Sequence, residues 1–119
     1  MIRRTVEQDL RLAQDTLEAG KAVEVVALDL RKLSDATDYF LIASGTSDTH
    51  VRALARRLIE AFERENRRPH HVEGLSAGRW VLLDFVDFVV HVFHPTLRNF
   101  YQLERLWADA PVVATGSGG

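Results

Sequence analysis

Apolar residues recur at helical spacing in three stretches of the chain, which predicts three helices. In the first stretch, residues 5–18, Thr5 and Gln8 fit a capping box at the helix start. The second stretch, residues 47–66, carries one apolar stripe with arginines and glutamates around much of the rest. The third begins at a proline, which suits the first position of a helix, and covers residues 95–108.

Between these stretches lie short segments rich in β-branched and aromatic residues, which are typical of strands. The strand–helix–strand order in the middle of the chain indicates one parallel crossover, and the short connection between the last two segments favours an antiparallel hairpin. The fold class is therefore α/β (or α+β), with a mixed β-sheet of about five strands flanked by helices. The expected strands are residues 23–30, 39–44, 71–73, 80–84 and 88–93.

The length of 119 residues fits one domain, expected over residues 1–109, followed by a disordered Gly/Ser tail over 110–119. The absence of cysteine excludes disulfides and cysteine zinc sites and is consistent with a cytoplasmic protein. The first residues pass directly into an amphipathic pattern, so we expect no secretory leader. The apolar runs are too short to span a bilayer, so no membrane partner is expected.

The charge balance argues against a protein that binds nucleic acid mainly through its phosphates. Fifteen basic residues face 17 acidic residues, and the formal net charge is −2. Phosphate-binding surfaces usually need a basic excess. Any nucleic-acid partner is therefore expected to be reached through another protein, with at most a minor contact from the arginines of the second helix.

Residues 45–47, Gly-Thr-Ser, lie at a strand-to-helix junction that resembles the one opening the active site of nucleotidyltransferases. We interpret it mainly as a turn in which Thr46 or Ser47 caps the helix. A nucleotidyltransferase also needs two carboxylates that point at one metal ion. The nearest pair, Asp84 and Asp87, is three residues apart and straddles a turn, so strand alternation does not place both on one face.

The remaining polar residues indicate neither a metal site nor a catalytic centre. Histidines occur as the pair at residues 70–71 and at positions 91 and 94, and neither spacing matches a helical zinc motif. No serine lies in a nucleophile elbow. We therefore expect hydrogen-bonded structural histidines, no cofactor and no enzymatic activity.

Aromatic and acidic residues in the C-terminal half allow two interpretations: packing in the core, which the sequence alone favours for each of them, and a protein-binding surface as the alternative. Trp80 begins a strand, where its large ring is costly to leave merely exposed. Tyr101 and Glu104 form a helical stripe beside another that includes Trp107 and resembles a core stripe. Tyrosine and tryptophan next to carboxylates are typical of binding hot spots.

Six fragments resemble, in order and spacing, the Iojap family of ribosomal silencing factors, and the resemblance covers about residues 5–108. The fragments are Gly45-Thr46-Ser47, His50-Val51, Glu73-Gly74, Trp80 to Asp84, Asp87 to Phe93 and Tyr101 to Trp107. Two further matches are residues 27–29 and 37–38. The chain departs from some relatives by having Phe85-Val86 where a glycine often loosens the hairpin.

This resemblance implies a nucleotidyltransferase-like fold without the catalytic carboxylates. It also implies binding to ribosomal protein fourteen on the intersubunit face of the large ribosomal subunit. That contact would block joining of the small subunit and repress translation when nutrients are limiting. The contact residues that it implies are Trp80, Asp84, Asp87, Tyr101, Glu104 and Trp107.

Three further expectations accompany this reading. The family tends to pair, and many apolar residues compete for one small core, so we expect a homodimer in the free state. A large-subunit assembly factor with the same docking site is one alternative function. An active nucleotidyltransferase-type enzyme on the same fold is another.

Overall fold

The computed structural model describes residues 5–97 and 110–113. Within these residues the chain forms two helices and five strands in the order that the sequence predicts. The expected third helix, residues 95–108, lies outside the described residues except for 95–97, which form a turn. The elements are α1 (Val6–Ala19), β1 (Val23–Asp29), β2 (Tyr39–Ser44), α2 (Asp48–Glu63), β3 (His71–Glu73), β4 (Trp80–Asp84) and β5 (Phe88–Phe93).

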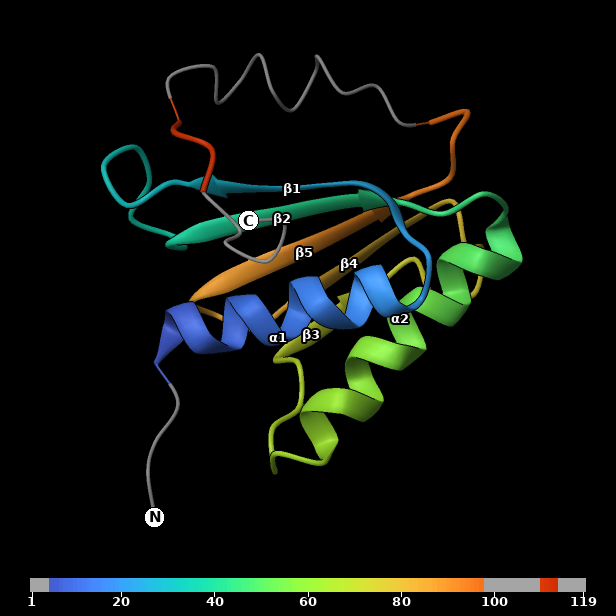
Figure 1. The fold of residues 1–119 in the computed structure, drawn as a ribbon, viewed down its shortest axis with the longest axis horizontal. Helices are drawn as coiled ribbons and strands as arrows, with labels where there is room; N and C mark the ends of the chain where they lie inside the picture. Colours follow the sequence, from blue (N-terminus) through green and yellow to red (C-terminus); the bar gives the residue numbers. More distant parts are fainter. Residues whose placement is uncertain (1–4, 98–109, 114–119) are drawn as a thin grey trace.

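The five strands form one mixed sheet in the order β1-β2-β5-β4-β3 (Figure 1). β2 and β5 are parallel and lie at its centre, while β1–β2, β5–β4 and β4–β3 are antiparallel pairs. The predicted crossover and hairpin are therefore confirmed. β2 is buried almost throughout, as its continuous apolar sequence predicts, because both faces of the sheet are covered at this strand.

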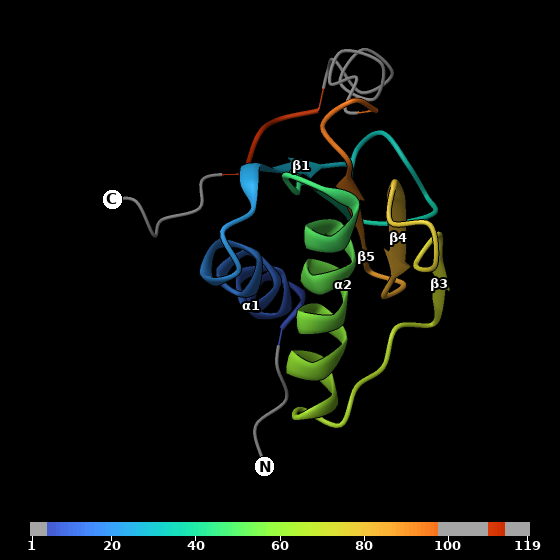
Figure 2. The ribbon, with the colours of Figure 1, turned by 90° about the vertical axis from the view of Figure 1, so that its right-hand side faces the viewer.

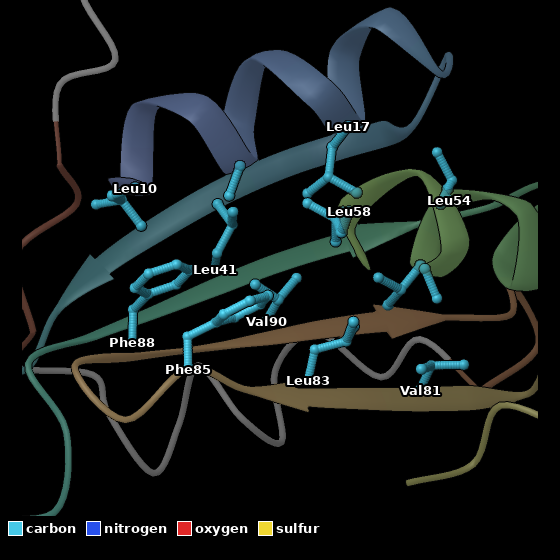
Figure 3. Close-up of a cluster of buried hydrophobic side chains, with 14 of the residues drawn as sticks. Leu10, Leu17, Leu41, Leu54, Leu58, Val81, Leu83, Phe85, Phe88 and Val90 are labelled. Carbon is cyan, nitrogen blue, oxygen red and sulfur yellow. The ribbon is translucent and has the colours of Figure 1, made fainter. Parts of the chain in front are cut away.

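α1 and α2 lie side by side on the same face of the sheet (Figures 1 and 2). Their apolar stripes meet the strand residues that point toward them, so that Leu17 and Leu58 pack above Leu41 and Val90 (Figure 3). Phe62 from α2 contacts the rings of Phe85 and Phe88. Of the helices within the described chain, neither has the length and apolar character required to cross a membrane.

Both helices begin at side-chain caps that the sequence marks. At α1 the hydroxyl of Thr5 accepts a hydrogen bond from the Gln8 backbone, and the Gln8 side chain accepts one from the Thr5 backbone. The buried carboxylate of Asp9 pairs with Arg67 just beyond α2. This ion pair joins the beginning of one helix to the end of the other.

Residues 110–113 differ from the expected disordered tail. The Val113 amide donates a hydrogen bond to the Ala27 carbonyl at 2.8 Å, and the Asp29 amide donates one to the Pro111 carbonyl at 2.9 Å. Val112 forms an antiparallel bridge with Leu28. This segment, drawn in red beside β1 in Figure 1, satisfies backbone groups at the outer edge of that strand.

Candidate functional site

The face of the sheet opposite the helices carries a group of stacked rings. Across the β4–β5 ladder Trp80 lies opposite Phe93, and the adjacent pair on this face is Leu82 with His91. The Phe40 ring of β2 meets the His91 imidazole edge-on at 4.7 Å between centroids. We refer to Phe40, Trp80, His91 and Phe93 as the aromatic cluster.

Trp80 is the exposed member of the aromatic cluster. Its side chain stacks on Phe93 with centroids 5.0 Å apart and an interplanar angle of 29°. Its indole Nε1–H donates a hydrogen bond of 3.2 Å to Nδ1 of His91. Even with these contacts, 48% of the residue is exposed. The indole is therefore held in one orientation while much of its surface remains available.

The short length of β3 and a glycine explain why Trp80 is accessible. β3 pairs with β4 only from residue 82 to residue 84, so Trp80 extends beyond it. The chain then turns at Gly74, which has a φ of +82°, and passes very close to the Trp80 backbone. A Cβ at Gly74 would lie 2.0 Å from the Trp80 carbonyl oxygen. Only glycine fits this close approach, which explains why a glycine follows Glu73.

His91 is the buried polar member of the aromatic cluster, with 4% of the residue exposed. Burial lowers the pKa of His91 from 6.5 to about 4, so the imidazole is neutral at physiological pH. Since Nδ1 accepts the indole hydrogen bond, the proton resides on Nε2. That Nε2 is buried and has no hydrogen-bond partner among the described residues.

Asp84 and Asp87 flank the turn between β4 and β5, at the other end of β4 from Trp80. Asp84 Oδ1 accepts a 2.7 Å hydrogen bond from the Val86 amide. Val86 has a φ of +76°, a conformation that a β-branched residue adopts only at a cost. The Asp87 side chain is exposed, and its backbone carbonyl accepts a hydrogen bond from the Asp38 amide. Asp84 thus shapes the turn in addition to pointing to the same face as Trp80.

The structure brings together part of the site expected from the sequence. Trp80 and Asp84 lie on one strand and one face, and Asp87 lies in the adjoining turn. Tyr101, Glu104 and Trp107 lie outside the described residues.

The junction between β2 and α2 is occupied by internal hydrogen bonds. Ser47 is the cap of α2 and accepts from the His50 amide. The Thr46 amide, which a phosphate-binding loop would offer to an anion, donates to Nδ1 of His50 at 2.8 Å. His50 Nε2 in turn donates to the Gly20 carbonyl at 2.8 Å. These contacts support the interpretation of residues 45–47 as a turn and helix cap.

Within the described part of the chain, no three histidine or carboxylate side chains are close enough to hold a metal ion together. Sequence reasoning treated His91 as one hydrogen-bonded histidine among several, and its bond to Trp80 agrees with that. It missed the link between these two residues, which are eleven positions apart. Only the register of the β4–β5 ladder could have revealed it, because register decides which side chains are neighbours on one face.

Comparison with known proteins gives consistent matches over most of the chain. The family model described as "Ribosomal silencing factor during starvation" matches residues 3–117. Ribosomal silencing factor RsfS of Bacillus subtilis is 41% identical over 104 residues, which cover 87% of this chain and 88% of that protein.

One solved structure and one more distant relative extend this comparison. A crystal structure of a protein from Chromobacterium violaceum superposes with a TM-score of 0.84 at 32% identity, covering 88% of each chain. The mouse protein named "Mitochondrial assembly of ribosomal large subunit protein 1" is 31% identical over 102 residues. The match covers 83% of this chain and 45% of the mouse protein.

Proposed function

We propose that this chain, which belongs to the family of ribosomal silencing factors, binds the large ribosomal subunit and prevents the small subunit from joining. The partner would be ribosomal protein fourteen on the intersubunit face, and the contact would repress translation under nutrient limitation in the cytoplasm. The observation that carries the proposal is the exposed, fixed indole of Trp80 on the face of the sheet opposite α1 and α2.

Trp80 has the properties of a binding hot spot. Tryptophan contributes a large apolar surface at interfaces and often dominates the binding energy. Stacking on Phe93 and the hydrogen bond to His91 hold the ring in place before a partner arrives. Less side-chain entropy is then lost on binding, so more of the contact energy appears as affinity.

The carboxylates at the other end of β4 would orient the partner. Trp80 and Asp84 are four positions apart, which is about 13 Å along a strand. A ribosomal protein surface is rich in lysine and arginine, so acidic groups near an aromatic anchor are electrostatically complementary to it. In this proposal Asp87 is the more accessible charge, because the Asp84 carboxylate also holds the Val86 amide. Tyr101, Glu104 and Trp107 are proposed to complete the surface.

The protein would act by occupancy, without catalysis or a cofactor. Its relatives are named as silencing factors, which agrees with this reading. The body of the domain, with α1 and α2 behind the docking face, would occupy space that the small subunit needs. No bond is made or broken, so the extent of repression would follow the fraction of large subunits that are bound.

Sedimentation with separated ribosomal particles tests the proposal. We expect the protein to sediment with isolated large subunits and not with small subunits or joined ribosomes. In a light-scattering assay of subunit joining, saturating protein should reduce the amplitude. Trp80→Ala should weaken both effects. Leu33→Ala is the matched control, because Leu33 is an apolar residue of similar exposure (42%) in another part of the fold. Sedimentation mainly with small subunits would contradict the proposal.

An assembly role is the second candidate, because the mouse relative is named for assembly of the ribosomal large subunit. The two roles differ in the particle that is bound. An assembly factor would bind immature large subunits more tightly than mature ones and would leave subunit joining unchanged. An enzyme on the same fold would instead bind a nucleoside triphosphate with magnesium at micromolar affinity, which calorimetry would detect.

The free protein is proposed to be a homodimer. Pairing would cover exposed apolar surface such as Val86, which is 55% exposed in the single chain. Light scattering at high concentration should give twice the chain mass of 13.5 kDa. A single-chain mass under these conditions would contradict this part of the proposal.

A further inference from the structure

We propose that His91 is a positioning residue for docking: it accepts the indole hydrogen bond of Trp80 and so holds the exposed ring in its binding orientation. This inference rests on the proposed function, since it concerns the residue that the docking face presents. The relatives' names say nothing of such a role. The geometry of the aromatic cluster and the cost of a buried imidazole both point to it.

The register of the β4–β5 ladder brings the two residues together. Trp80 lies opposite Phe93, and His91 is the next residue of β5 on the same face, so the indole reaches its diagonal neighbour. The stack on Phe93 fixes the plane of the ring. Stacking alone permits the ring to slide or turn over, whereas the 3.2 Å bond to Nδ1 selects one placement.

The surroundings of His91 keep the acceptor in the required form. The Phe40 and His91 ring centroids lie 4.7 Å apart with the rings nearly perpendicular, and the Phe93 ring lies roughly parallel to the imidazole with its centroid 6.2 Å away. These rings exclude water, and burial disfavours the charged imidazolium. Neutral His91 with its proton on Nε2 can offer only Nδ1 as an acceptor, and the indole occupies that atom.

The imidazole is a poor choice for stability at this position. Nε2–H is buried without a hydrogen-bond partner among the residues that the structure describes. A buried donor that is left unpaired is costly, and an apolar side chain of similar volume usually avoids the cost. Leucine would therefore suit folding at least as well as histidine. What leucine lacks is the acceptor for Trp80, so the benefit of histidine is expected in binding.

Three variants separate a positioning role from a packing role. His91→Leu keeps the volume and removes the acceptor. His91→Asn places an amide oxygen near the position of Nδ1 and retains an acceptor. Trp80→Phe identifies the Trp80 indole signal by its disappearance from a ¹⁵N–¹H spectrum, which is needed because the chain has two tryptophans.

The indole signal and the affinity for large subunits are then measured for each variant. We expect His91→Leu to be as stable as the wild type, to shift the Trp80 indole proton upfield toward its unbonded position, and to speed its exchange with solvent. Its affinity should fall about three- to tenfold, the effect of ordering one side chain on binding. His91→Asn should keep the bonded signal and bind within about twofold of the wild type.

Failure of the inference is distinct from failure of the proposed function. If His91→Leu loses the indole hydrogen bond and still binds as the wild type does, His91 has no positioning role. If Leu and Asn lower stability and affinity equally, the residue acts only through packing, and the inference is again wrong. If Trp80→Ala itself leaves large-subunit binding unchanged, the docking face is misplaced, and the proposed function fails first.

Discussion

The two faces of the central sheet are built from different kinds of residue. The face under α1 and α2 is closed by aliphatic and phenylalanine side chains, and its strand residues Leu41, Leu83 and Val90 are fully buried. The opposite face carries an indole that is half exposed and an imidazole whose donor finds no partner within residues 5–97 and 110–113. The first arrangement buries its large strand side chains, whereas the second buries a smaller apolar cluster and leaves one large ring half exposed.

This difference indicates where selection has acted on something other than folding. Polar groups without partners and large exposed rings are expected where a surface serves binding. Under α1 and α2 the buried atoms Asp9 Oδ1 and Gln14 Nε2 also have no hydrogen-bond partner among the described residues, so it is the half-exposed ring of Trp80 that distinguishes the opposite face. Changes on the two faces should therefore separate stability from binding.

The largest effect is expected on the helix-covered face. Phe62 is fully buried and contacts the rings of Phe85 and Phe88, so Phe62→Ala removes a large apolar side chain and leaves a cavity. The free energy of unfolding should fall by about 4 kcal/mol. Urea denaturation measures it. A loss under about 1 kcal/mol would show that this face is not the principal core.

The next effect is a pH dependence specific to the opposite face. Burial lowers the pKa of His91 to about 4, whereas the unfolded chain titrates near 6.5. Between these values only the unfolded chain binds the proton, so stability falls as the pH is lowered from 6.5 to 4. His91 should account for about 3 kcal/mol over this window.

The measurement is the difference between wild type and His91→Asn in urea unfolding at several pH values, because other groups titrate equally in both. On acidification through the window the wild type should lose about 3 kcal/mol relative to His91→Asn, and the difference between the two curves should stay constant above pH 7. Parallel curves throughout would mean that the imidazole is not held neutral by burial.

A smaller effect in energy, but a decisive one for function, is expected from Trp80→Ala. Loss of a hot-spot aromatic should weaken binding to large subunits by about 2 kcal/mol, roughly thirtyfold. Stability should fall by only about 1 kcal/mol, since the lost contact is one half-exposed stack. Sedimentation binding and thermal melts on the same samples give both numbers. If the comparison of the two faces holds, Phe62→Ala should instead lower stability far more than it lowers the affinity of the folded protein.

The smallest effect concerns the turn that ends β4. Val86 occupies the left-handed region with a φ of +76°, where a β-branched side chain is strained. Glycine adopts this conformation without strain but gains entropy in the unfolded chain, so Val86→Gly should stabilise the protein by about 1 kcal/mol. The denaturant midpoints of the wild type and the variant measure this change in stability. A destabilised variant would mean that the exposed valine makes compensating contacts.

The order of elements was predictable from the sequence because each carries a local signal. The capping box of Thr5 and Gln8, the apolar run of residues 39–44 and the short 85–87 connection all depend on residues close in sequence. β4 and β5 have the predicted bounds, while β1 ends one residue earlier than expected, at Asp29. Strand ends depend on pairing partners, which a local pattern does not specify.

The aromatic cluster was predictable only in part. The sequence indicates Trp80 as a candidate for binding. The contact between Trp80 and His91 depends on the register of β4 and β5, which a single strand does not specify. The turn-forming role of Asp84 depends on the positive φ of Val86. A β-branched residue rarely adopts that conformation, so the sequence does not predict it. Residues 110–113 resembled a tail because their partner, β1, lies more than eighty residues earlier in the chain.

The parallel pairing of β2 with β5 at the centre of the sheet has a consequence for how the chain folds. α2, β3 and β4 lie between the two strands in the sequence. The contacts that pair β2 with β5 therefore link residues about fifty positions apart. Such distant contacts slow folding, because the loop between them must be closed before they form. During synthesis, a nascent chain that ends before residue 88 can form the β1–β2 pair but leaves the inner edge of β2 open. An open edge of this apolar strand can pair with other chains, so the docking of β5 onto β2 is the step that protects the protein from aggregation.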